Sequence, residues 1–158
     1  MRRFLGLGSI ASVAVVLTGA VLAQAQYGTA EEAKAMLLKA VAAVKADKTK
    51  ALETFNKGEG GFLDRDLYPF CANTSDGILL AVANPNAKQN LGKDVRGLKD
   101  ATGKAFGQEL FDAGQKPEGQ ISEVSYEFAR PGDPKPVAKV SYVTRVGDIY
   151  CGVGYYKK

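Results

Sequence analysis

The most reactive side chains in this sequence are two cysteines, Cys71 and Cys151, because the chain contains no histidine. A Ser-His-Asp triad, a Cys-His pair and a histidine-rich zinc site all need an imidazole, so these chemistries are excluded. Two cysteines in an oxidising compartment usually form a structural disulfide. The alternative is a redox-active pair, but the sequence contains no Cys-x-x-Cys motif. We expect a disulfide that joins the first and last strands of the fold.

Acidic residues offer no other route to catalysis. No pair of them has the spacing or the apolar setting of a tuned general acid and base. The adjacent charges of Asp64, Arg65 and Asp66 cannot all point in one direction, so we interpret them as a solvated loop with a local ion pair, not a metal site. The sequence favours a protein that is not an enzyme and has no metal or cofactor. A secreted enzyme that exchanges disulfides through Cys71 and Cys151 is the alternative.

The first 25 residues have the pattern of a secretory signal peptide. The basic start Met1-Arg2-Arg3 precedes an uncharged, largely apolar run from 4 to 22, and Ala23-Gln24-Ala25 fits the small-x-small rule for cleavage. We predict a signal peptide over 1–25, a single domain over 26–158 and a periplasmic location. An uncleaved membrane anchor is the alternative, because the uncharged run approaches the roughly 20 residues that span a bilayer.

The overall composition fits one soluble domain without a nucleic-acid surface. The chain has 158 residues, of which 46% are apolar and 24% charged, and this length suits a single domain. Its formal charge of +4 includes Arg2 and Arg3 of the predicted signal peptide. No cluster of lysines and arginines is interleaved with aromatic residues, so we expect no nucleic-acid partner.

The elements that must position any site begin with helices. Thr29 and Glu32 form a capping box in front of a helix predicted over about 30–46. Asp47 then predicts a second helix start, and Gly58 its end. The first helix has one apolar face, made by residues at spacings of three and four: Ala33, Met36, Leu37, Ala40, Val41 and Val44.

The rest of the chain has the texture of strands, with one long crossing segment. Asp76-Gly77 predicts a tight hairpin turn, and the segment 84–119 contains a short amphipathic helix marked by Phe106, Leu110 and Phe111. The pattern predicts an α+β fold in which the N-terminal helices pack on a five-stranded antiparallel sheet. The expected strands are 68–73, 78–83, 120–128, 137–146 and 149–157.

Several short motifs, taken in their order and spacing from about residue 30 to 157, resemble the small single Cache domain family. The resemblance implies a PAS-like fold with a long N-terminal helix packed on a five-stranded antiparallel sheet, and a small-molecule pocket over one sheet face. The motifs are GGFLDRDLY at Gly60–Tyr68, NLGKDV at Asn90–Val95 and DATGKAF at Asp100–Phe106, followed by VSYEF, KVSYV and GVGYY.

The resemblance also implies a function. Cache domains are extracytoplasmic ligand-sensing modules, and ligands typical of the small members are short carboxylates such as acetate, lactate, pyruvate or propionate. The chain stops soon after its last predicted strand, so we expect a stand-alone secreted member that acts through a separate membrane chemoreceptor or sensor kinase. We expect a monomer or weak dimer.

Site residues follow from the matching motifs. Lys139 and Tyr142 fall on the family's Lys-x-Ser-Tyr strand, Tyr126 on its Tyr-x-Trp strand and Tyr156 on the terminal Gly-x-Gly-x-Tyr. Asn84 belongs to Val-Ala-Asn-Pro, where relatives often have His-Gly-Ala-Asn-Pro, so the imidazole is absent here. Because of this departure, two alternatives stay open: the protein binds a different ligand from its relatives, or it is an interaction module whose pocket is filled by side chains.

Each of these residues also has a purely structural interpretation. Because side chains alternate along a strand, Lys139 and Tyr142 cannot both point into one pocket without a bulge, so one of them is expected to be structural. Lys139 could instead pair with a carboxylate such as Asp66. The tyrosines could pack in the core with their hydroxyls bonded to the backbone. Gly152 and Gly154 indicate a close approach of another element to the last strand.

Overall fold

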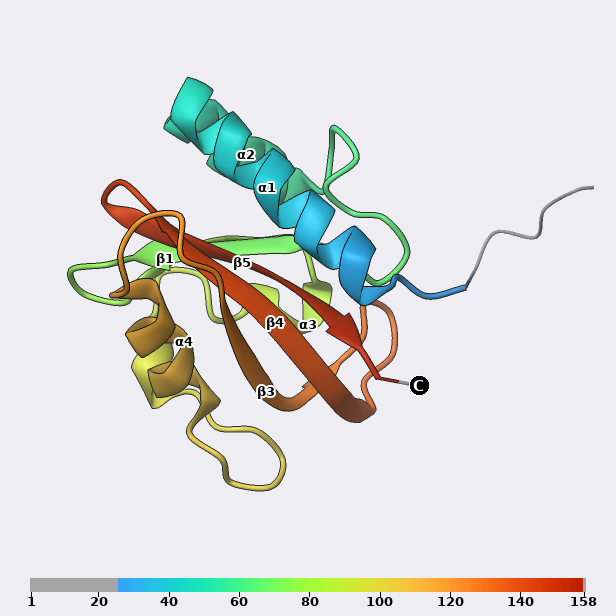
Figure 1. The fold of residues 1–158 in the computed structure, drawn as a ribbon. Helices are drawn as coiled ribbons and strands as arrows, with labels where there is room; N and C mark the ends of the chain where they lie inside the picture. Colours follow the sequence, from blue (N-terminus) through green and yellow to red (C-terminus); the bar gives the residue numbers. More distant parts are fainter. Residues whose placement is uncertain (1–25, 158) are drawn as a thin grey trace, which may run out of the picture.

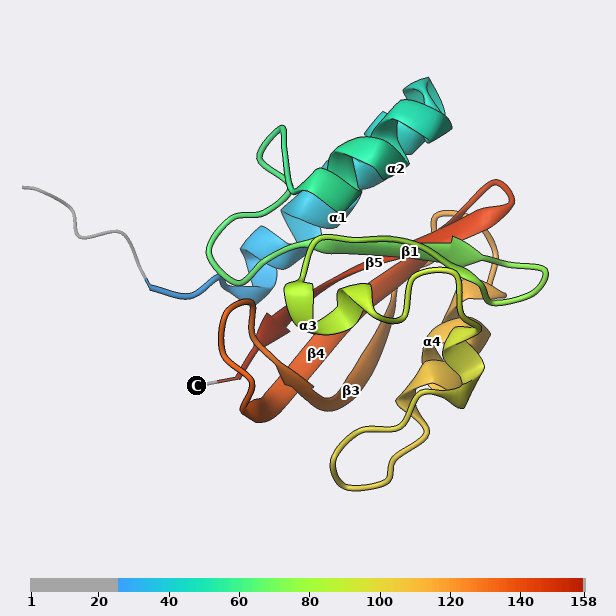
Figure 2. The same cartoon turned by 180° about the vertical axis from the view of Figure 1, so that it is seen from behind.

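The computed structural model describes residues 26–157, so the predicted signal peptide lies outside the described residues. Two helices lie on one face of an antiparallel sheet and a third helix lies on the other face (Figures 1 and 2). The elements in chain order are α1 Ala30–Ala46, α2 Lys48–Lys57, β1 Pro69–Asn73, β2 Leu79–Val82, α3 Pro85–Lys88, the 3-10 turn η1 Val95–Gly97, α4 Phe106–Gly114, β3 Ser122–Ala129, β4 Pro136–Val146 and β5 Ile149–Tyr156.

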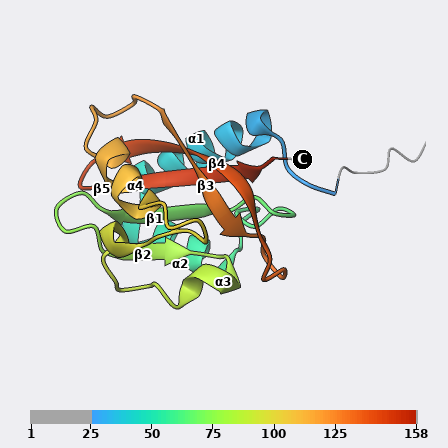
Figure 3. The same ribbon diagram turned by 90° about the horizontal axis from the view of Figure 1, so that it is seen from below.

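The predicted α+β architecture is confirmed, including the five antiparallel strands. Their order across the sheet is β2-β1-β5-β4-β3, which Figure 3 shows side by side. The last strand is therefore central, between the first strand and β4. The long segment between β2 and β3 carries the chain from one edge of the sheet to the other, as its length requires.

The two N-terminal helices begin and end where local chemistry directs them. The Thr29 side chain accepts from Glu32 N, and the Glu32 side chain accepts from Thr29 N, so the predicted capping box is present. Asp47 caps α2 by accepting from Lys50 N, and Gly58 ends it with φ of 68°. The apolar face of α1 packs on the sheet, and the buried residues of that face are Ala33, Met36, Leu37, Ala40 and Val44.

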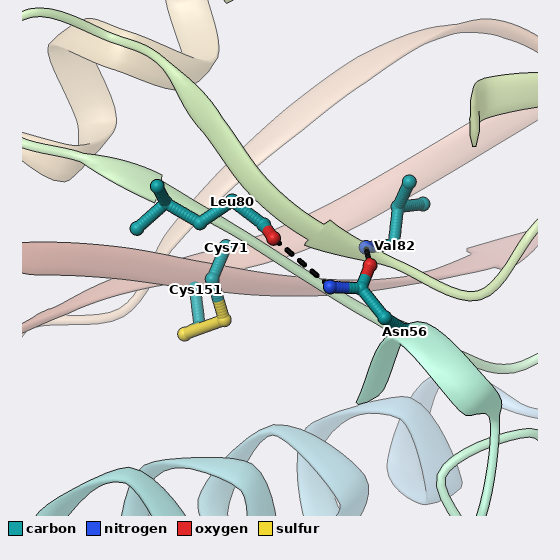
Figure 4. The surroundings of a disulfide bond; sticks show 5 residues. All are labelled: Asn56, Cys71, Leu80, Val82 and Cys151. Atoms are coloured by element: carbon teal, nitrogen blue, oxygen red, sulfur yellow. Dashed lines mark hydrogen bonds between the residues drawn. A yellow bond between two sulfur atoms is a disulfide. The ribbon is translucent and has the colours of Figure 1, made fainter. Parts of the chain in front are cut away.

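The predicted disulfide is present and lies between α1 and the sheet. Cys71 of β1 and Cys151 of β5 face each other directly in the strand register, with their sulfurs 2.09 Å apart, and both residues are fully buried (Figure 4). The bond closes a loop of 80 residues, which stabilises the fold by up to about 4 to 5 kcal/mol in the chain-entropy model. Beside it, Asn56 of α2 ties down edge strand β2 through Leu80 O and Val82 N.

Each sheet face has its own hydrophobic core. The first lies under α1 and α2 and includes the disulfide. The second lies under α4 and the segment from α3 to η1, and it contains most of the aromatic residues of the sheet. Between residues 26 and 157, no helix combines the length and apolarity needed to cross a bilayer.

Candidate functional site

Three neighbouring strands place one row of polar side chains on the face that α4 covers. Lys139 of β4 lies opposite Tyr126 of β3 on one side and opposite Tyr156 of β5 on the other. Residues directly opposite in an antiparallel pair point to the same face. The register therefore brings together three of the predicted site residues.

Lys139 is the most unusual of them, because its side chain is only 2% exposed and carries a positive charge. Its Nζ donates to the Tyr68 hydroxyl at 2.8 Å. The same Nζ lies 4.3 Å from the ring centroid of Tyr68, 5.0 Å from that of Tyr156 and 5.6 Å from that of Phe128. Among residues 26–157, no carboxylate forms an ion pair with Lys139. Aromatic faces thus replace part of the hydration that the ammonium loses on burial.

The Tyr68 hydroxyl is the centre of a buried hydrogen-bond chain. It accepts from Lys139 Nζ and from Asn84 Nδ2, each at 2.8 Å, which uses both of its lone pairs. Its own proton is therefore donated to the Tyr156 hydroxyl at 3.2 Å, and that hydroxyl donates to Ala129 O at 2.8 Å. Because every hydroxyl in this series of hydrogen bonds has a defined donor and acceptor role, the series holds the rings of Tyr68 and Tyr156 in place around the ammonium.

The ammonium faces a small apolar cavity of about 40 Å³. A water molecule needs about 10 to 15 Å³ measured in this way, so the cavity accommodates only a few non-hydrogen atoms. Of the described residues that line it, Lys139 is the only charged one. The lining residues are Tyr68, Phe70, Leu79, Val82, Ala87, Asn90, Val95, Leu98, Phe106, Leu110, Tyr126, Phe128 and Lys139.

The balance of forces keeps Lys139 protonated. Burial lowers the pKa of Lys139, but electrostatic attraction to Tyr126, Tyr68 and Tyr156 and the hydrogen bond to Tyr68 outweigh burial, so the pKa of Lys139 is raised. Burial raises the pKa of Tyr126, and the same cause raises that of Tyr156. At neutral pH the charge at the cavity is therefore the ammonium of Lys139, and Tyr126 beside it is a neutral phenol. An anion, above all a carboxylate, is the ligand that such a site can pair with.

The other predicted site residues take different places. Tyr126 lines the cavity, bonds to the Ser141 hydroxyl at 2.8 Å and stacks on Phe106 with ring centroids 4.4 Å apart. Tyr156 and Asn84 do not line the cavity but hold Tyr68 in position. Asn84 also starts α3 by accepting from Asn86 N.

Tyr142 is not brought into this site. Alternation along β4 places it on the opposite face from Lys139, where its ring lies 6.0 Å from that of Tyr155 in the core under α1. Of the pair Lys139 and Tyr142, the lysine is the one that faces the cavity.

The pairing of Lys139 with Asp66 does not occur, and Asp66 is not part of a solvated loop. The Asp66 carboxylate is buried, accepts from Gly28 N at 2.7 Å and pairs with Arg130 at 3.3 Å. Arg65 forms the expected local ion pair with Asp64 at 2.9 Å and a second ion pair with Glu32. No group of three potential metal ligands occurs in the described part of the chain.

Sequence reasoning missed Tyr68, which the structure places at the centre of the site. The signal was present, because Tyr68 is the last residue of the GGFLDRDLY motif and directly precedes β1. The close approach predicted at Gly152 and Gly154 is present. A Cβ at Gly152 would overlap the Phe70 ring of β1, and a Cβ at Gly154 would overlap the Lys139 and Ser141 side chains of β4.

The sheet, backed by a long N-terminal helix on one face and hollowed on the other, has the PAS-like architecture of extracytoplasmic sensor domains. The chain belongs to the family described as Single Cache domain 2, whose sequence pattern matches residues 10–157. No curated protein matches the chain.

Solved structures with a similar fold include two chemotaxis proteins and a Cache chemosensory domain. A methyl-accepting chemotaxis protein from Vibrio parahaemolyticus RIMD 2210633 is 26% identical with a TM-score of 0.63, over 80% of this chain and 86% of that chain. A periplasmic sensor domain of a chemotaxis protein is 24% identical with a TM-score of 0.58, over 81% and 90%. A Cache chemosensory domain, described for its recognition of carboxylic acids, is 20% identical with a TM-score of 0.57, over 81% and 88%. The last two likenesses concern the fold alone.

Proposed function

We propose that this protein is a periplasmic sensor module that binds a short carboxylate at Lys139 and passes the signal to a separate membrane chemoreceptor or sensor kinase. The observation that carries the proposal is the buried ammonium of Lys139, which faces a small apolar cavity without a carboxylate partner in the described part of the chain. Pairing this cation with an anionic ligand supplies the counter-charge that the fold itself does not supply.

The size of the cavity supports short acids as the ligand class. A cavity of about 40 Å³ holds a group the size of acetate or propionate more readily than a longer chain. Membership of a sensory family and the likeness to chemotaxis proteins support the signalling role. We propose a monomer or weak dimer.

The disulfide gives little support to the enzymatic alternative. Exchange begins when a thiolate attacks one of the two sulfurs. Both Cys71 and Cys151 are fully buried under α1, so an attacking thiolate has no access to either sulfur in the folded protein.

Calorimetric titration of the protein with formate, acetate, propionate and lactate tests the proposal. Replacing Lys139→Met keeps the length of the side chain and removes the charge, so we expect at least one acid to lose about 10- to 100-fold in affinity. Lys116→Met, at an exposed lysine, is the matched control and should leave the affinity unchanged. Heat signals that are flat for all acids with the wild-type protein would refute carboxylate binding and favour the interaction module with a filled pocket.

A further inference from the structure

The cavity at Lys139 has a larger neighbour on the outside of the molecule. A groove of about 320 Å³ lies between α3, the segment 99–101 and the hairpin of β3 and β4. Its lining is mainly polar and includes Asn86, Lys99 and Glu127. Within the described part of the chain, Phe128 is the only residue that lines both the inner cavity and this groove. Phe128 is therefore the residue at which the two spaces adjoin.

Phe128 is packed less tightly than the other aromatic residues of the cavity. Tyr126 and Phe106 stack with an interplanar angle of 5° and are both buried. Phe128 is only half-buried and meets these rings edge-on, at centroid distances of 6.2 and 6.0 Å. Its ring is thus the least confined of the aromatic groups beside Lys139, whose Nζ lies 5.6 Å from the ring centroid.

Hydrogen bonds that do not involve Phe128 hold both flanks of the outer groove. The Asp100 carboxylate accepts from Glu127 N at 3.0 Å, which ties the segment 99–101 to β3. On the other side, Asn86 Nδ2 donates to Arg130 O at 2.8 Å and to Asp133 O at 3.0 Å, which ties α3 to the turn after β3. A smaller side chain at position 128 would therefore join two preformed spaces and need not open a new one.

We propose that Phe128 sets the length of acid that this site accepts, with the carboxylate on Lys139 and the ring of Phe128 blocking extension of the ligand into the outer groove. The proposal rests on the proposed function, because it assumes that an acid binds at Lys139. It implies that the wild-type site selects acids of two or three carbons. It also implies that the groove becomes a second compartment for the tail of a longer acid when the ring is removed.

Calorimetric titration of the wild-type protein and of Phe128→Ala with acetate, butyrate and hexanoate tests this proposal. We expect the wild-type protein to bind acetate more tightly than hexanoate, and Phe128→Ala to gain at least about tenfold in affinity for hexanoate relative to acetate. Phe111→Ala is the matched control, because Phe111 is also half-buried but lines neither space, and it should keep the wild-type preference. Phe128→Leu should give an intermediate gain and covers the case in which the alanine variant fails to fold.

The outcomes separate this proposal from the proposed function. If acetate binds through Lys139 but both Phe128 variants keep the wild-type preference for chain length, Phe128 is not the limiting wall and only this inference fails. The inference about Phe128 also fails if the wild-type protein binds hexanoate as tightly as acetate. If the wild-type protein binds none of the acids, and the Phe128 variants bind none either, the proposed function and this inference both fail.

Discussion

A buried ammonium needs several partners, and Lys139 obtains most of them from aromatic groups. Its Nζ donates to the Tyr68 hydroxyl, and the rings of Tyr68, Tyr156, Phe128 and Tyr126 lie within 5.8 Å of it. An ammonium can donate three hydrogen bonds. In the proposed function, the ligand carboxylate accepts from the part of this ammonium that does not face Tyr68.

The hydroxyl of Tyr68 is predicted to contribute to stability, in contrast to that of Tyr150. Both tyrosines are 1% exposed, but Tyr68 OH has three hydrogen-bond partners, whereas Tyr150 OH has none among the described residues. Tyr68→Phe leaves Lys139 and Asn84 without their shared acceptor and should lower the free energy of unfolding by about 1 to 3 kcal/mol. Urea denaturation measures the effect.

Tyr150→Phe is the matched control, and it should leave the free energy of unfolding unchanged or slightly increased, because it removes an unsatisfied buried hydroxyl. Equal losses for the two variants would contradict the role assigned to Tyr68.

At the scale of elements, helix starts set by nearby residues could be predicted from the sequence, whereas contacts between residues far apart in the chain could not. The capping box of Thr29 and the N-cap of Asp47 depend on neighbours three residues away, so the sequence is enough to place α1 and α2. The four-residue helix α3 is too short to produce a periodic pattern, and it lies in the segment 84–119, where the sequence predicts only the helix marked by Phe106, Leu110 and Phe111. The role of Tyr68 arises from strands far apart in the chain, and so depends on the register of the sheet.

The sequence alone could not tell whether Lys139 or Tyr142 faces the cavity. Alternation along β4 shows that only one of them can face a given side. Both faces of β4 are covered, one by α1 and the other by α4, so the pattern of apolar residues does not tell which face is which. Only the register with β3 and β5 assigns Lys139 to the cavity side.

The loop before α4 is predicted to depend on ionised Asp100. Its carboxylate accepts from the Thr102 hydroxyl, Glu127 N, Lys104 N and Thr102 N, which lowers the pKa of Asp100 to about 2. Because the folded-state pKa is depressed, the stability it contributes is present above the unfolded value of about 3.9 and is lost as the pH falls through about 2.

Asp100→Asn should therefore unfold at a lower temperature than the wild-type protein at neutral pH, and the difference should shrink as the pH falls from about 4 toward about 2. Thermal unfolding followed by circular dichroism across this pH range checks it. A difference that stays constant down to the lowest pH would contradict a role for the ionised carboxylate.

At the scale of the whole molecule, the start of the domain and the end of β5 meet at Arg130. Its guanidinium carbon lies 4.3 Å from the ring centroid of Tyr27 and 4.9 Å from that of Tyr156, and its Nε pairs with buried Asp66. Asp66 in turn accepts from Gly28 N. Figure 1 shows the start of α1 near the end of β5. One arginine therefore connects both ends of the described chain to the hydroxyl network beside Lys139.

Arg130→Met is predicted to lower the free energy of unfolding by about 3 kcal/mol, because it leaves the buried Asp66 carboxylate without its cation. Arg145→Met, at a half-buried arginine with a backbone carbonyl as its partner, should cost less than about 1 kcal/mol. Urea denaturation of both variants measures the comparison, and equal costs would contradict the view that Arg130 joins the two ends.

In the proposed function, an acid binds with its carboxylate on Lys139. The most direct measurement is nuclear magnetic resonance of the protein with carbon-13 at the lysine ε positions, titrated with acetate and propionate. We predict that the Lys139 signal shifts and saturates while the signals of the exposed lysines stay unchanged. Saturable binding of either acid that leaves the Lys139 signal in place would contradict the claim.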